Sequence, residues 1–150
     1  MARRRLNVSL KSGAAMHVNR LSVGTMKLVY VIVQNKLIHY PWGNSYIAYI
    51  GTTEKGIDRI SQSVAAKAPQ VLRAHGVDRF DVRLVTCKGR QRVRTWRKLE
   101  RAMLLAFREM YGEPPKYNVH GKAMREIAEF DLFARERIKE ILRQVDSAAP

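Results

Sequence analysis

The feature that most limits the fold of this chain is a pair of short apolar stretches separated by turn residues. Residues 28–33 are apolar and largely β-branched, which favours a β-strand. Residues 40–44 (Tyr-Pro-Trp-Gly-Asn) combine a proline, which fixes φ, with a Gly-Asn pair that tolerates positive φ. Residues 45–51 form a second strand-like stretch. Because two strands joined by a short turn pair antiparallel, the sequence predicts a β-hairpin.

The rest of the chain predicts three helices and one more strand. In chain order these are a helix over residues 55–68, a strand over 80–87, a helix over 91–111 and a helix over 122–145. Thr52, Thr53 and Glu54 supply capping oxygens for the first helix, and Pro69 ends it. The predicted fold is therefore α/β of the α+β kind. It has a small three-stranded mixed or antiparallel sheet flanked by helices in the order ββαβαα.

A length of 150 residues fits a single domain with a real core. Residues 1–26 contain five basic side chains and little patterning, which indicates a flexible basic arm. We expect residues 27–121 to form the core and residues 122–146 to form an amphipathic helix packed on it, followed by a short tail at 147–150. Packing on the core is the expected role of that last helix, and homodimer formation through it is the alternative to a monomer.

Positive charge is the strongest compositional signal. The chain has 28 Lys and Arg against 13 Asp and Glu, a net charge of +15, and its first carboxylate is Glu54. Such a field favours a polyanion, so we expect a nucleic acid as partner, DNA ahead of RNA. No apolar run approaches the ~20 residues of a membrane span, and no membrane partner is expected. The single cysteine, Cys87, fits a cytoplasmic or other intracellular protein, with organelle targeting by the basic N-terminus as an alternative.

Glu100 is the first candidate for chemistry. It stands among Trp96, Met103, Leu104 and Phe107, which recur at helical spacing and define the inward face of the predicted helix over 91–111. A carboxylate on an apolar face has to be paired, protonated or bound to a metal. Two interpretations stay open: a buried pair with an arginine, or a ligand for one hard divalent ion, Mg²⁺ or Mn²⁺, shared with waters and a substrate phosphate.

A dense basic run leads into the same helix. Because unpaired like charges repel along a helix, a merely solvated face is the weaker explanation, and we expect these side chains to grip phosphates beside the site. The predicted nucleic-acid-binding residues are Lys88, Arg90, Arg92, Arg94, Arg97, Lys98 and Arg101.

A second cluster carries tyrosines. Leu28-Val29-Tyr30, then Tyr49-Ile50-Gly51, Arg59 eight residues after that glycine, Leu99-Glu100 and finally Asn118 follow in order along the chain. This ordered set resembles the signature of the GIY-YIG endonuclease family, and the resemblance covers residues 27–121. Three departures are visible. The first motif reads Leu-Val-Tyr instead of carrying a glycine, and the hairpin between the two tyrosines is longer than usual for the family and contains Trp42. Ser63 occupies a place where a basic or imidazole side chain is common.

The resemblance implies a metal-dependent endonuclease that hydrolyses phosphodiester bonds. Tyr30 or Tyr49 would take the proton of the attacking water, which requires that nearby cations lower a tyrosine pKa from its usual ~10. Arg59 would hold a non-bridging phosphate oxygen, and Glu100 would hold the metal. Asn118 would fix local geometry through its amide or close the turn before the last helix. The sequence leaves the choice between the two tyrosines open.

Two other hypotheses compete with the nuclease. One is a non-catalytic DNA- or RNA-binding protein on the same scaffold, and the other is an unrelated basic protein of ribosome or chromatin whose motif match is accidental. His39 and His75 have no metal-ligand spacing and are interpreted as structural or exposed.

Overall fold

The structure is a computed structural model that describes residues 5–15, 27–88, 94–118 and 128–150. The described elements follow one another as β1 (Leu28–Tyr40), β2 (Gly43–Thr53), α1 (Ile57–Arg73), β3 (Phe80–Val85), α2 (Thr95–Tyr111), the 3₁₀ turn η1 (Ala128–Asp131) and α3 (Arg135–Ser147). The described strands form one antiparallel sheet in the order β2-β1-β3, with β1 at its centre. The predicted α+β class and the order ββαβαα are confirmed.

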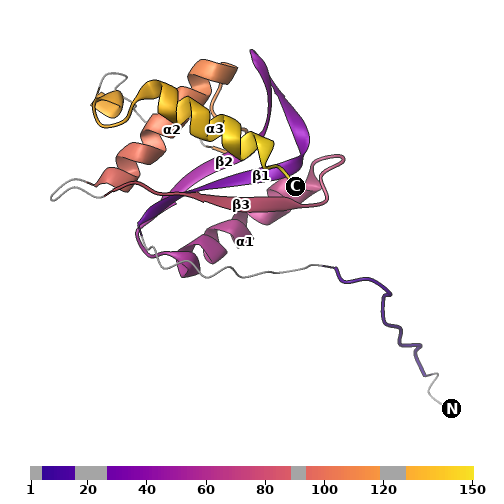
Figure 1. Cartoon of the computed structure of the whole chain (residues 1–150). Helices are drawn as coiled ribbons and strands as arrows, with labels where there is room; N and C mark the ends of the chain where they lie inside the picture. The colour runs from indigo at the N-terminus through magenta and orange to yellow at the C-terminus, as the bar shows by residue number, and fades with distance from the viewer. Residues whose placement is uncertain (1–4, 16–26, 89–93, 119–127) are drawn as a thin grey trace.

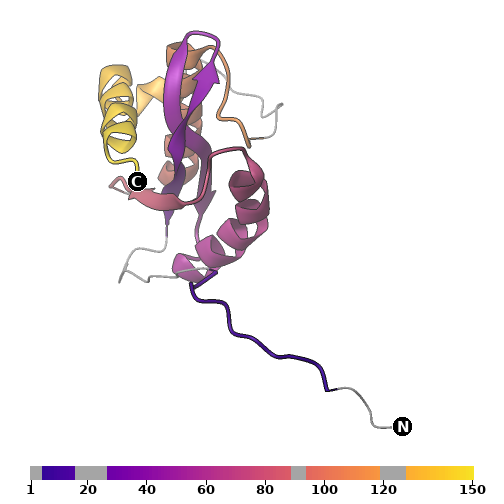
Figure 2. The same ribbon diagram turned by 90° about the vertical axis from the view of Figure 1, so that its right-hand side faces the viewer.

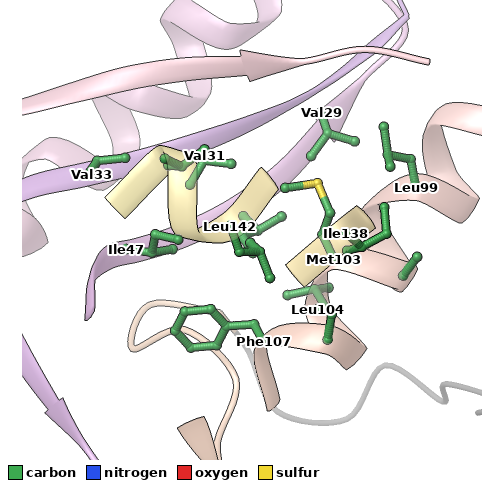
Figure 3. Packing of buried hydrophobic residues seen from close by; sticks show 14 of the residues in the cluster. Val29, Val31, Val33, Ile47, Leu99, Met103, Leu104, Phe107, Ile138 and Leu142 are labelled. Carbon is green, nitrogen blue, oxygen red and sulfur yellow. The ribbon is translucent and has the colours of Figure 1, made fainter. Parts of the chain in front are cut away.

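The sheet lies between two layers of helix (Figures 1 and 2), with α1 on one face and α2 and α3 on the other. Residues 28–33 of β1 are buried on both faces, as expected for a central strand. Val29, Val31 and Val33 point toward α2 and α3, where they meet Met103, Phe107, Ile138 and Leu142 (Figure 3). The alternate residues of β1 contact the α1 side.

Both strands of the hairpin are longer than the apolar stretches predicted. Polar residues continue β1 as far as Tyr40, beyond the predicted end at residue 33, and the register shifts between Ile32 and Ile38. Tertiary contacts hold this extension: the Tyr40 hydroxyl donates to the Ile47 carbonyl at 2.8 Å, and the Trp42 amide donates to the Tyr111 carbonyl at 3.1 Å. Because these hydrogen bonds and not an apolar pattern hold residues 34–40 in the strand, the sequence predicted an end of β1 that is too early.

Helix α1 corrects two predictions. Its N-cap is Gly56, at φ 73°, and no side chain caps it, whereas residues 52–54 were expected to do so. The helix also continues through Pro69 to Arg73 instead of ending at the proline. A proline removes one backbone donor and strains the preceding turn. The final turn nevertheless buries Val71 completely against Ile32 and Ala48, and this packing offsets the loss.

Helix α2 ends at Gly112, which adopts φ 88° as the C-cap, in agreement with the prediction. The predicted start of this helix, residues 91–93, lies outside the described residues. The continuous helix predicted over 122–145 is wrong: residues 122–127 lie outside the described residues, and η1 and α3 are separate elements. The break between them lets Phe130 and Phe133 both pack against the core.

The apolar face of α3 is covered by its own chain, because Ile138, Leu142 and Val145 are buried against α2 and the sheet. Residues 5–15, by contrast, extend away from the body of the protein (Figures 1 and 2). Within the part of the chain that the structure describes, no helix is both long and apolar enough to cross a lipid bilayer.

Candidate active site

Two tyrosines from neighbouring strands pack over one glycine. Antiparallel pairing sets Tyr30 of β1 opposite Gly51 of β2, and the rings of Tyr30 and Tyr49 lie 5.8 Å apart, centre to centre. A Cβ at position 51 would lie 2.6 Å from Cζ of Tyr30 and 2.7 Å from Cε1 of Tyr49. Real carbon atoms do not approach so closely. The glycine of the Tyr-Ile-Gly motif is therefore required by the space that the two rings occupy.

Asn118 ties the segment after α2 to strand β2, next to Tyr49 and Gly51. Its Nδ2 donates to the Ile50 carbonyl at 2.8 Å, and its Oδ1 accepts from the Ile50 amide at 3.0 Å. The Tyr117 amide donates to the Ala48 carbonyl at 3.0 Å, so residues 117–118 continue the ladder along the edge strand β2. Asn118 also closes a turn through its own amide, which donates to the Pro115 carbonyl. The two side-chain bonds fix the backbone between Tyr49 and Gly51, and the residues that follow Asn118 lie outside the described part of the chain.

Glu100 is buried, with 4% of its surface exposed, on the inward face of α2. Its position among apolar residues is the one that the helical spacing predicted. The carboxylate lies close enough to the tyrosine pair for its charge to raise the pKa of Tyr49. Strand β2 and helix α2 thus bring together two residues that are fifty-one positions apart in the sequence.

The pKa of Tyr49 is raised above its usual value. Burial is the largest cause, followed by the charge that Tyr30 would carry, a hydrogen bond with Tyr30, and the carboxylate of Glu100. Lys67 lies over the Tyr49 ring at 4.8 Å, but its ammonium group donates to the Tyr117 carbonyl. The direction of this shift is opposite to the lowered pKa that a tyrosine base requires. In this arrangement Tyr49 holds its proton firmly.

Arg59 lies in the first turns of α1, exposed, with its Nη1 donating to Oε1 of Gln62 at 3.2 Å. Ile60, the next residue, is buried beside Tyr30 and Leu28 and so anchors this part of α1 to the tyrosine face of the sheet. A hollow of about 360 Å³ adjoins Arg59. Its lining residues come from the end of β2, the start of α1 and the first turn of α2: Thr52, Thr53, Glu54, Lys55, Arg59, Trp96 and Arg97.

This hollow brings Arg59 together with Arg97, which was predicted to bind nucleic acid. Glu100 does not line it, but it lies one helical turn beyond Trp96 and Arg97 on α2. Lys55 and Lys27 were missed by the sequence analysis: Lys55 lines the hollow, and the ammonium of Lys27 lies 4.6 Å from the centre of the Trp96 ring. Apart from its positive charge, neither lysine has a feature in the sequence that would have identified it.

Most of the predicted basic run is exposed around the start of α2. Lys88, Arg94, Arg97 and Arg101 are exposed and Lys98 is half-buried, while Arg90 and Arg92 lie outside the described residues. A larger hollow, of about 510 Å³, lies beside the outer half of β1 and contains none of the predicted catalytic residues.

Across the described ranges, no group of three or more His, Cys, Asp or Glu side chains could hold a metal ion. No family model, no curated protein and no solved structure matches this chain.

Proposed function

We propose that this protein is a divalent-metal-dependent endonuclease of the GIY-YIG type that hydrolyses phosphodiester bonds, with DNA as its substrate. The observation that carries the proposal is the convergence of Tyr30, Tyr49 and Gly51 with the buried carboxylate of Glu100. Packing alone does not require a carboxylate at that position. An intracellular location is part of the proposal, because that is where DNA would be met.

In this proposal the residues of the chain have the following roles. Arg59, exposed beside the hollow, binds a non-bridging oxygen of the scissile phosphate and stabilises the charge that develops on it. Tyr30 would orient the attacking water and, once it is deprotonated to the phenolate, would accept the proton of that water, since Tyr49 retains its own. Asn118 keeps the strand between Tyr49 and Gly51 straight. Lys55, Arg97 and Lys27 attract the neighbouring phosphates.

The donor set fits Mg²⁺ or Mn²⁺. The buried carboxylate of Glu100 is a hard oxygen ligand, and Mg²⁺ commonly binds one or two carboxylates together with waters and substrate phosphates. A divalent ion held by Glu100 would neutralise negative charge on the phosphate during hydrolysis. Positive charge there would also oppose the effect of Glu100 on the pKa of Tyr49.

A second function, binding nucleic acid without cleaving it, is favoured by one specific observation. The pKa of Tyr49 is raised, and the Arg59 guanidinium donates a hydrogen bond to Gln62 of its own helix. A scaffold in this state would bind phosphates through its basic surface and perform no chemistry.

Supercoiled plasmid separates the two functions. Purified protein with Mg²⁺ is expected to nick or linearise the plasmid, and excess EDTA is expected to stop the reaction. Salt-dependent binding of the same plasmid with no cleavage in Mg²⁺ or Mn²⁺ would support the non-catalytic function instead.

A further inference from the structure

Residues 5–11 of the arm carry a strand-like pattern that is not covered by the chain itself. Leu6, Val8 and Leu10 alternate with Asn7 and Ser9, and the three apolar side chains are 89%, 97% and 98% exposed. The alternation would place all three on one face of an extended segment. Three neighbouring apolar side chains in water indicate a surface on which they are buried.

The outer edge of β3 has the matching features. Strand β3 is the end strand of the sheet, so one row of its backbone donors and acceptors faces away from β1. It contains no proline or glycine to prevent pairing. Phe80, Val82 and Leu84 share the face that packs toward α1, and all three are only half-buried. An added strand would complete their burial.

The two segments match residue by residue when they run antiparallel. With Val8 opposite Val82, Leu6 lies opposite Leu84 and Leu10 opposite Phe80. On the other face the same register sets Ser9 opposite Asp81 and Asn7 opposite Arg83. The side chains of Asp81 and Arg83 are nearly half exposed and form an ion pair at 3.7 Å. Neutral hydrogen-bonding residues thus meet the two charges of β3, while Lys11 falls opposite Arg79, one residue before the strand.

The direction of the arm bears on which copy of the chain supplies the added strand. Figures 1 and 2 both show residues 5–15 directed away from the chain's own sheet. Each chain also offers one arm and one β3 edge, so two copies can exchange arms in a closed, twofold-symmetric pair. We propose that residues 5–11 of one copy add to β3 of a second copy as an antiparallel strand, forming an arm-exchanged dimer. This proposal does not depend on the proposed nuclease activity.

Sedimentation of the full chain without nucleic acid tests the dimer. The wild-type protein is expected to form dimers with rising concentration, and the variant Leu6→Ser/Val8→Ser/Leu10→Ser is expected to stay monomeric. Asn7→Ala/Ser9→Ala is the matched control in the same segment and should dimerise as the wild type does. A wild-type protein that remains a monomer, or a dimer that survives the triple serine change, would overturn the proposal.

A disulfide identifies the occupant. Opposite residues of an antiparallel pair have Cα atoms ~4.5–5.5 Å apart, within reach of a disulfide. In a chain carrying Cys87→Ser to remove the native thiol, Ser9→Cys and Asp81→Cys together are expected to give a species of twice the chain mass after mild oxidation. The tryptic peptides should join position 9 to position 81. A link between these positions within one chain would show that the arm folds onto its own sheet, which contradicts an exchanged dimer.

Discussion

At the turn end of the β1–β2 hairpin, Asp146 of α3 lies beside Tyr111; further along β2, Glu100 of α2 lies near Tyr49. Both carboxylates raise the pKa of a partly buried tyrosine. Asp146 accepts hydrogen bonds from the Ser45 hydroxyl, the Tyr46 amide and the Tyr111 hydroxyl, at 2.8–3.0 Å. Through these bonds Asp146 joins α3 to β2 and α2, which is a structural role.

The surroundings of Glu100 are different. It lies on an apolar helix face, one turn from a hollow that collects Arg59, Lys55 and Arg97. A site for phosphate needs cations facing an open space, and this hollow supplies them. The same pair of residue types therefore serves structure at one end of the hairpin and, in our proposal, catalysis at the other. Substitutions at each end should separate the two roles.

The largest expected effect comes from Arg59→Ala. Losing one donor to the charge of the transition state should slow plasmid cleavage by about 10²–10³-fold. The melting temperature should hardly change, because the side chain is exposed and its hydrogen bond to Gln62 lies on the surface of the same helix. Arg137→Ala is the control, since exposed Arg137 also bonds a side chain three residues further along its helix, Glu140 of α3, away from the hollow. Equal cleavage rates for the two variants would show that Arg59 is a surface charge with no part in catalysis.

Gly51→Ala should damage stability and cleavage together. The new methyl group would overlap both tyrosine rings, and overpacking of this kind destabilises by about 1–3 kcal/mol. The rings can relieve the overlap only by moving, so cleavage by the folded protein should also fall. Gly13→Ala is the matched control, because a Cβ there meets no atom within 4 Å. Denaturant unfolding and initial cleavage rates measured on both variants test this, and an unchanged Gly51→Ala would mean that the rings do not pack as described.

Tyr111→Phe should affect stability alone. At neutral pH the variant loses the hydrogen bond to Asp146, worth about 1 kcal/mol. Burial and the charge of Asp146 raise the pKa of Tyr111 to about 12 from 10.0, so the unfolded chain releases this proton first. Stability from Tyr111 is therefore complete below pH 10 and is lost as the pH rises toward 12. The variant should show a shallower loss over that range, with wild-type cleavage at neutral pH.

The smallest effect is expected from the charges of the arm. Replacing Arg3, Arg4, Arg5, Lys11 and Arg20 by serine should reduce the salt dependence of DNA binding. The slope of log K against log salt should fall by ~0.9 for each phosphate that the arm no longer neutralises. Cleavage at saturating protein should remain. An unchanged slope would show that the arm does not touch phosphates.

The sequence was sufficient for the fold class and for the burial of Glu100, because both follow from local periodicity. It was also sufficient for the antiparallel hairpin, but not for its register: the pairs next to the turn would set Tyr30 opposite Thr53, and the irregularities between Ile32 and Ile38 set it opposite Gly51. It failed where tertiary packing overrides local preference: Val71 carries α1 through Pro69, and the contacts of Tyr40 extend β1 past its apolar stretch.

Other features of the candidate site could not be predicted from a single sequence. The direction of the pKa shift of Tyr49 depends on how deeply its ring is buried, which no motif encodes. Lys55 and Lys27 enter the site because the end of β2 and the start of α2 meet in space. The two hydrogen bonds of Asn118 to Ile50 likewise depend on the path of the chain after α2.

The most direct test of the proposed active site compares Glu100→Gln with Asp146→Asn, each a near-isosteric loss of one carboxylate charge. For Glu100→Gln we predict no Mg²⁺-dependent cleavage, DNA binding equal to or tighter than that of the wild type, and an unchanged melting temperature. For Asp146→Asn we predict the reverse: stability lower by about 1–3 kcal/mol and normal cleavage by the protein that remains folded. A stability loss of about 3–5 kcal/mol in Glu100→Gln, with binding and cleavage falling together, would make Glu100 a structural partner. A stable Glu100→Gln protein that cleaves normally would contradict the assignment of the active site.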